Sequence, residues 1–280
     1  MDLAAPFYSR ATRCDCSIDG FMKIFRLLLS GGAISFVIAG PSMLPAHAAS
    51  VLDNVGIRQR YEQCLSLANL NPTEALRSAT EWSKAKGGAP AEHCLAMALT
   101  ELKRYPEAAA RLDALGRAPD MGNLRASVFD QAGNAWMLAG NGAKATASFS
   151  AALALSANDA DLYADLARAQ AMQKDWKSAE ADLNAALEIQ PRRSDFLILR
   201  ASALAAQGKL REARDDADSA LKLKPNSAEA LVQRGDIARR AGDIGAARRD
   251  FQAALKIAGG GETADAARSE LSLLDDAAPK

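Results

Sequence analysis

Residues 160–191 carry the pattern of two short amphipathic helices joined by a turn. Apolar residues recur at helical spacing in two runs: Leu162, Tyr163, Leu166, Ala167 and Ala169, then Ala179, Leu183, Ala186, Leu187 and Ile189. The turn is expected at residues 173–175, and Pro191 ends the second helix. Asp165 and Arg168 are expected to face water. Two helices of this size cannot bury their apolar faces on each other alone, so the pattern predicts neighbouring units.

The same pattern returns every 34 residues, in four consecutive units that begin at residues 126, 160, 194 and 228. The shared small residues are Gly133, Ala167, Ala201 and Gly235 at position 8, Ala145, Ala179, Ala213 and Ala247 at position 20, and Ala152, Ala186, Ala220 and Ala254 at position 27. Position 24 holds Phe149, Leu183, Ala217 and Phe251. Gly140, Gly208 and Gly242 fall at the turn between helices, where a positive φ is easily adopted.

On these positions the chain resembles the tetratricopeptide repeat family, which also favours proline at position 32. Pro191 and Pro225 fill that position, whereas Ala157 and Gly259 depart from it. The resemblance covers about residues 55–276. It implies an all-α fold, a right-handed superhelical solenoid of helix pairs closed by a C-terminal capping helix.

We expect the repeat domain at residues 49–280, with helix pairs at about 55–88, 89–122, 126–159, 160–193, 194–227 and 228–261 and a cap at 262–276. The stretch 117–125 is about three residues longer than the period allows, so an irregular connection is expected there. In the first pair, Asn71 should cap the second helix.

The N-terminal residues 1–48 read as a leader. Lys23 and Arg26 precede an apolar run at residues 27–40, and Ala46-His47-Ala48 gives the small–x–small pattern of a cleavage site. Residues 22–48 therefore predict a secretory signal peptide, and residues 1–21 are expected not to be translated. The alternative is an uncleaved signal that anchors the protein in a membrane.

The composition of the chain argues against several classes of function. The chain has 34 basic and 34 acidic residues, which gives no support for binding nucleic acid or an anionic membrane surface. Its two histidines and four cysteines offer little material for metal or acid–base chemistry. The neighbouring carboxylates Asp215-Asp216 and Asp275-Asp276 are expected to be solvated. We predict no enzyme activity, no cofactor and no metal site.

Two cysteines follow the leader, in the similar contexts EQCLSLA and EHCLAMA. Cys64 and Cys94 lie on the first helices of consecutive units, which are neighbours in a repeat stack. After export to an oxidising compartment they would form a disulfide that stabilises the fold by about 3–4 kcal/mol in the chain-entropy model. The alternative is a pair of separate buried thiols.

The resemblance also implies a binding surface. In the family, positions 2, 5, 9 and 12 of each first helix line a concave groove that binds peptides. The candidates carried over to this chain are Asp130, Asn134, Met137, Asp161, Arg168, Asp195, Ser202, Glu229, Asp236 and Arg239. The family's clamp for peptide carboxylates needs lysine at position 5, where Asp130 reverses the charge, so that ligand class is rejected.

These observations predict an exported scaffold or adaptor that binds a protein or peptide in its groove, in the periplasm if the source is Gram-negative. The alternative is a membrane-anchored envelope assembly factor retained by an uncleaved signal.

The leader prediction is tested by the N-terminal residue of the purified exported protein. Mass spectrometry should find Ala49 first, because cleavage is expected after Ala48. A chain that begins at Asp2 or retains residues 22–48 would contradict cleavage.

Overall fold

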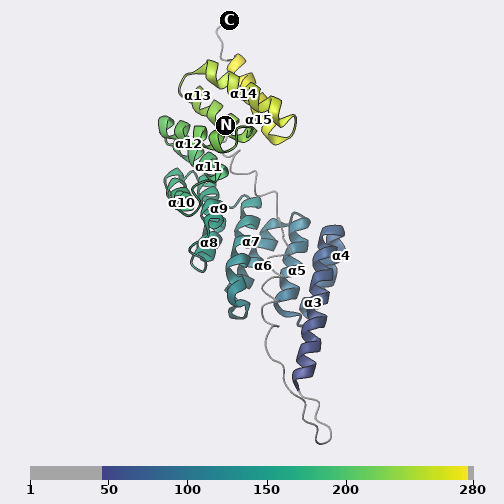
Figure 1. Ribbon diagram of the computed structural model, residues 1–280. Coiled ribbons are helices and arrows are strands. Elements are labelled where there is room, and N and C mark those ends of the chain that lie inside the picture. Colours follow the sequence, from purple (N-terminus) through teal and green to yellow (C-terminus); the bar gives the residue numbers. More distant parts are fainter. Residues whose placement is uncertain (1–45, 277–280) are drawn as a thin grey trace, which may run out of the picture.

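The computed structural model describes residues 46–276, and the side chains within this range apart from those of residues 46–54, 119–120 and 276. The predicted leader lies outside the described residues up to position 45, and Ala46 to Ala48 form the start of the first described helix. The described part is all helical, as predicted, and its helices follow one another in antiparallel pairs along a solenoid (Figure 1).

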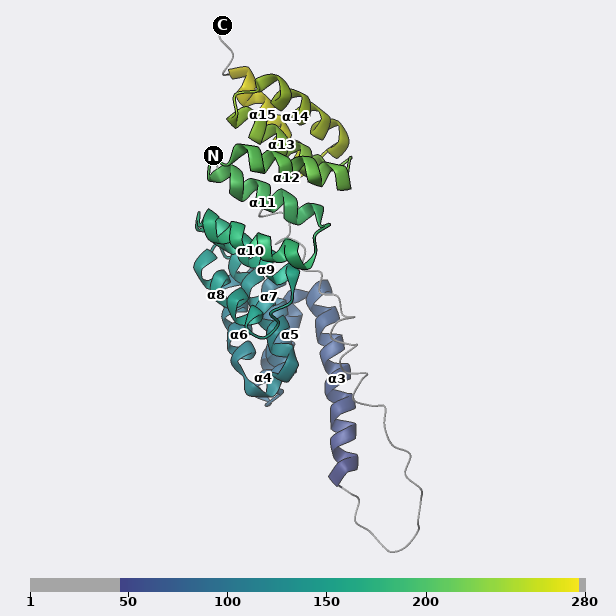
Figure 2. The same cartoon turned by 60° about the vertical axis from the view of Figure 1, so that its left-hand side comes forward.

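Six helix pairs and a final single helix make up this solenoid. They are α3 (Ala46–Leu70) and α4 (Pro72–Lys84), α5 (Gly88–Glu101) and α6 (Tyr105–Arg117), α7 (Arg125–Leu138) and α8 (Gly142–Leu153), α9 (Ala160–Met172) and α10 (Trp176–Ile189), α11 (Ser194–Ala206) and α12 (Leu210–Leu223), α13 (Ala228–Arg240) and α14 (Ile244–Ala258), and α15 (Glu262–Asp276). Both views show the pairs stacked in chain order (Figures 1 and 2).

The turns within the pairs use positive φ, as predicted. Gly140, Gly208 and Gly242 have φ of 72°, 78° and 84°. In the pair α9–α10 the same place is taken by Lys174, with φ 62°. The 34-residue period therefore sets the turn conformation even where glycine is absent.

Close approach within each pair depends on matched side chains at positions 8 and 24. Gly133 and Gly235 lie against the rings of Phe149 and Phe251, and a Cβ on either glycine would come within 2.6 Å of the ring. Where position 24 is the smaller Leu183 or Ala217, position 8 is alanine. A large ring at position 24 is thus accompanied by glycine at position 8, and a smaller side chain at position 24 by alanine at position 8.

Paired charges connect consecutive units. Arg200 donates two hydrogen bonds of 2.7 Å to the carboxylate of Asp216, which is buried, and a third of 2.8 Å to Asn184 Oδ1. Each partner comes from a different helix, α10, α11 or α12. The expectation that Asp216 is solvated is therefore wrong: its carboxylate can be buried because a bidentate guanidinium satisfies it.

The same arrangement recurs one unit later. Arg234 donates to Asp250 at 2.7 and 2.8 Å and to Asp218 at 2.9 Å. These residues lie on α12, α13 and α14. Arg200 and Arg234, at equivalent positions of consecutive units, therefore join neighbouring helices in the same way.

The irregular connection expected at residues 117–125 is present as a 3-10 helix, Pro119–Leu124. Gly122 within it has φ 51°, outside the helical range. Arg125 Nε donates 2.9 Å to the carbonyl oxygen of Gly116 across this connection. The expected cap on the helix after Asn71 is also present, since its side chain accepts from the Glu74 amide at 3.2 Å.

The final helix covers the end of the solenoid, as expected of a cap. Its buried side chains are Ala264, Ala267 and Leu274. Ala266 is only half-buried, because the helix packs on α13 and α14 through the neighbouring face.

Gly235→Ala should lower the free energy of unfolding by about 1–3 kcal/mol, because the added methyl overpacks the Phe251 ring. Combining it with Phe251→Leu recreates the natural pair Ala167–Leu183 and should recover more than half of the loss. Denaturant unfolding followed by circular dichroism measures both.

The matched control is Gly245→Ala, a helical glycine whose added Cβ would meet nothing closer than 3.5 Å. It should be neutral or stabilising, because alanine favours helix. If Gly235→Ala behaves like this control, the packing argument is wrong.

Candidate functional site

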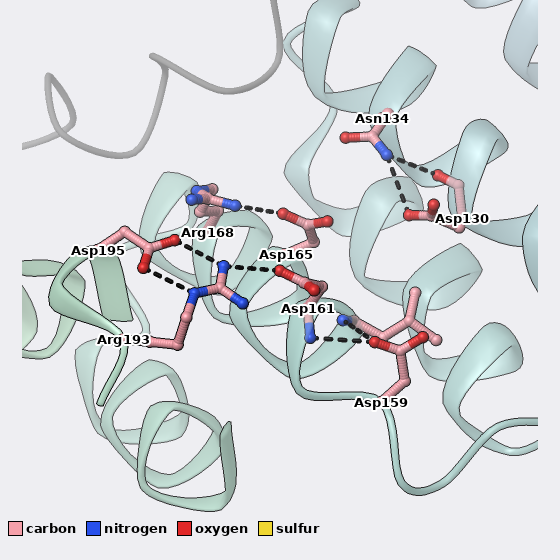
Figure 3. A network of polar contacts seen from close by, with 9 residues as sticks. Asp130, Asn134, Asp159, Asp161, Asp165, Arg168, Arg193 and Asp195 are labelled. Atoms are coloured by element: carbon pink, nitrogen blue, oxygen red, sulfur yellow. Dashed lines mark hydrogen bonds and ion pairs between the residues drawn. The ribbon is translucent and has the colours of Figure 1, made fainter. Parts of the chain in front are cut away.

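The ten predicted groove residues lie on four first helices. Asp130, Asn134 and Met137 are on α7, Asp161 and Arg168 on α9, Asp195 and Ser202 on α11, and Glu229, Asp236 and Arg239 on α13. We call the surface formed by these four helices the first-helix face. Figure 3 shows the polar contacts of five of the ten residues: Asp130 pairs with Asn134, Arg168 with Asp165, and Asp161 and Asp195 with Arg193.

Three of the ten are buried and offer no accessible side chain. Met137 is 3% exposed, Arg168 4% and Ser202 1%. The helices α9 and α11 pack against elements on both sides along the stack, and this packing encloses their middle turns. Arg168 was expected to face water, and the structure shows it buried and paired with Asp165.

Arg193 joins the starts of α9 and α11, and sequence reasoning missed it. Its guanidinium donates 2.9 Å to Asp161 and 2.7 and 2.9 Å to Asp195 (Figure 3). Its Cζ lies 4.0 Å from the centre of the Phe196 ring. Hydrogen bonding to Asp195, then to Asp161, raises the pKa of Arg193 further above its usual value.

A signal for Arg193 does exist in the sequence. It occupies the last position of its unit, immediately before a first helix, where Asp159 and Ser227 serve as N-caps in other units. Asp159 Oδ1 accepts from the amides of Asp161 and Leu162 at 3.0 and 3.2 Å. Arg193 makes no such cap, so the break in the capping pattern marks a residue with another role.

Aspartates outnumber arginines among the polar residues drawn in Figure 3. Asn134 donates to the carbonyl and carboxylate oxygens of Asp130 at 3.1 and 3.0 Å. The network in Figure 3 contains the aspartates Asp130, Asp159, Asp161, Asp165 and Asp195 and the arginines Arg168 and Arg193, a formal net charge of −3. Its most accessible carboxylates are those of Asp161 and Asp195, whose side chains are 45% and 37% exposed.

On α13 the predicted residues bind the cap. Asp236 pairs with Arg239 and, at 2.7 Å, with Arg240, and Arg239 reaches Glu270 of α15 at 3.0 Å. Burial raises the pKa of Glu270, although Arg239 opposes this shift. Glu229 is exposed and accepts from Ser227 Oγ at 3.0 Å. Asp236 and Arg239 therefore stabilise the end of the solenoid, whereas Glu229 is accessible.

The two cysteines after the leader meet in the structure. The Cα atoms of Cys64 and Cys94 are 6.1 Å apart and their sulfurs are within bonding contact, joining α3 to α5. Beside them, Tyr61 Oη and His93 Nδ1 are 2.7 Å apart, and His93 Nε2 and Gln131 Oε1 are 2.6 Å apart. Because the Gln131 oxygen only accepts, the ring donates at Nε2 and accepts from the Tyr61 hydroxyl at Nδ1.

A metal site, a membrane-spanning helix and a pocket are three other features that could point to a function. No three histidine, cysteine or acidic side chains gather as a metal site among the described residues. Within the same part of the chain, no helix has the length and apolar character needed to cross a bilayer. A hollow of about 550 Å³ lies over α6, lined by Glu92, Glu107, Ala110, Arg111, Ala114, Leu115 and Ala118. It is separate from the network at the helix starts.

Comparison with known proteins agrees with the fold. Profiles described as tetratricopeptide repeat match residues 137–203 and 228–259. Comparison with curated protein sequences gave no match.

Solved structures share the arrangement. The crystal structure of YrrB, described as a TPR protein with an unusual peptide-binding site, is 20% identical, covers 68% of this chain and 96% of its own, and has a TM-score of 0.50. A crystal structure of MamA is 17% identical over 59% of this chain and 95% of its own, with a TM-score of 0.52. MamA from Desulfovibrio magneticus RS-1 is 19% identical over 60% and 94%, with a TM-score of 0.54. These likenesses show the fold.

His93 should make the stability depend on pH. It is buried, and this burial lowers its pKa below the usual value of 6.5. Below about pH 6.5, His93 is therefore protonated in the unfolded chain while it remains neutral in the folded chain. The free energy of unfolding should fall by up to about 1.4 kcal/mol per pH unit until the folded-state pKa is reached, and His93 should contribute no slope above pH 6.5.

Denaturant unfolding between pH 5 and 7.5 measures this slope. The variant His93→Gln retains every carboxylate but loses the titrating ring, so the stability difference between the two proteins should shrink as the pH falls. Parallel pH curves for the two proteins would show that His93 does not carry the effect.

Proposed function

We propose that this chain, whose described part is a solenoid of tetratricopeptide repeats, is an exported scaffold that binds a protein or peptide on its first-helix face. The fold itself supports an interaction role, because stacked helix pairs present an extended surface to partners. The structure of YrrB, with its peptide-binding site, supports a peptide as the kind of ligand. We propose no catalytic role for this surface, because its polar side chains pair as carboxylates with arginines or amides.

The observation that carries the proposal is the pair of accessible carboxylates, Asp161 and Asp195, at the starts of α9 and α11. The residues drawn in Figure 3 have a formal net charge of −3, and Arg125 at the start of α7 and Arg192 beside Arg193 reduce it to −1 for the wider region. Asp161 and Asp195 are its accessible carboxylates, and Arg193 holds them at fixed positions. One arginine cannot neutralise two carboxylates, so a ligand that brings a basic side chain to their exposed side would compensate the remaining negative charge. We therefore propose an extended segment that carries lysine or arginine.

Export is the second part of the proposal, and residues 22–48 and the pairing of Cys64 with Cys94 support it. The compartment is the periplasm if the source is Gram-negative. An uncleaved signal would instead give a membrane-anchored assembly factor with the same first-helix face, and the N-terminal residue of the exported protein distinguishes the two.

Site-specific photocrosslinking in living cells tests the surface. Photoreactive residues at Asn134 and Glu229, on first helices, should give at least fivefold more crosslinked partner than residues at Lys222 and Arg249, which lie on second helices. Crosslinks mainly from Lys222 and Arg249 would overturn the proposal.

The ligand's charge is tested in the same assay. The double variant Asp161→Asn with Asp195→Asn should lower the crosslink yield from Asn134 several-fold, because it removes the accessible negative charge. The matched control, Glu212→Gln with Asp215→Asn on exposed positions of α12, removes the same charge elsewhere and should leave the yield unchanged. Equal yields in both double variants would reject a basic ligand while leaving the surface itself in place.

A further inference from the structure

The first helix pair contributes few large side chains to the core. Among the side chains that the structure describes, from residue 55 on, the buried apolar residues of α3 and α4 are Tyr61, Cys64 and Ala68, then Ala75, Ala79 and Trp82. The pair α7–α8 instead buries Phe129, Trp136, Met137, Phe149 and Leu153, together with several small residues. Within the described side chains, apolar burial therefore holds α3–α4 to the stack less strongly than it holds α7–α8.

Two specific links join α3 to α5 at one place. Tyr61 and Cys64 lie one turn apart on α3, and their partners His93 and Cys94 are adjacent on α5. Gln131 extends the hydrogen-bonded chain from His93 to α7. The links coincide with the small cluster of apolar side chains that includes Trp82 and Leu99.

The position of the two cysteines in the chain decides what their bond would do. They are 30 residues apart, and the loop between them contains the whole of α4. With the bond in place, α3 cannot leave α5, and α4 can open only as a closed loop, which has fewer conformations than a free chain. Without the bond, α3 and α4 can leave the stack together.

We propose that the Cys64–Cys94 bond is a latch that determines whether the first helix pair stays docked on the solenoid. The bond forms by exchange with an external disulfide: the thiolate of one cysteine attacks RSSR and releases RSH, and the second cysteine then displaces the other RSH. The two cysteine thiols are oxidised to one disulfide, and RSSR is reduced to two thiols.

Burial of the two cysteines favours formation of the disulfide over its reduction. Cys64 is 6% exposed and Cys94 is fully buried, so an external thiol or disulfide reaches them only when α3 has opened. In the reduced chain this opening is frequent and oxidation can proceed. In the oxidised chain it is rare, and the bond is protected from reductants. The latch thus closes once, on first contact with an oxidant, and it does not depend on the proposed ligand of the first-helix face.

Hydrogen exchange with mass spectrometry tests the latch on the purified full chain. Three forms are compared: the oxidised protein, the protein reduced under denaturing conditions and refolded with reductant, and the variant Cys64→Ala with Cys94→Ala. Peptides from α4 should exchange at least tenfold faster in the second and third forms. Peptides from α9 to α12 should exchange equally in all three.

The chain that begins at Ala49, the N-terminus expected after cleavage, lacks Cys14 and Cys16 and should keep the slow exchange of the oxidised form. Peptide mapping without reductant should find Cys64 linked to Cys94. Equal exchange of α4 in all three forms overturns the proposal, as does faster exchange spread evenly over every helix, which would show a global rather than a local role. Failure to find the Cys64–Cys94 peptide after oxidation also overturns it.

Discussion

The fold depends on how closely the two helices of each pair approach. Alanine or glycine at positions 8, 20 and 27 removes the side chains that would hold the helices apart, and these residues are almost completely buried. The approach is close enough for aromatic rings to touch backbone, as Phe251 does at Gly235. Since each pair buries only part of its apolar surface, the next pair must complete the core, and the solenoid follows from this requirement.

Arginine–carboxylate contacts have two different functions in the described chain. In the C-terminal units, Arg200 and Arg234 join three helices each, so their carboxylate partners can be buried. At the starts of α9 and α11, Arg193 is shared between two carboxylates that keep about two-fifths of their side-chain surface in water. The first arrangement stabilises the array, and the second leaves charge available for a partner.

Much of the fold could be predicted because it repeats. Gly140, Gly208 and Gly242 identify the turns, and Asn71 identifies a helix start, from local chemistry alone. The site was harder to predict, because its contacts depend on how far one unit is rotated relative to the next. The sequence positions of Arg168 and Ser202 place them on first helices, but only the packing of neighbouring units shows that they are buried. Arg193 pairs with Asp161, 32 residues before it, and no local pattern encodes that contact.

The arginine links of the C-terminal units also bear on the curvature of the solenoid. A guanidinium is planar and offers donors in a fixed fork, so Arg200 sets the spacing and relative rotation of α10, α11 and α12 together. Arg234 repeats this for α12, α13 and α14. These two side chains therefore add to the apolar packing in fixing how the helices of this part are arranged. Lysine at either position would retain the charge, but its single ammonium group would not fix the relative orientation of the three helices. The superhelix could then wind more loosely or more tightly there.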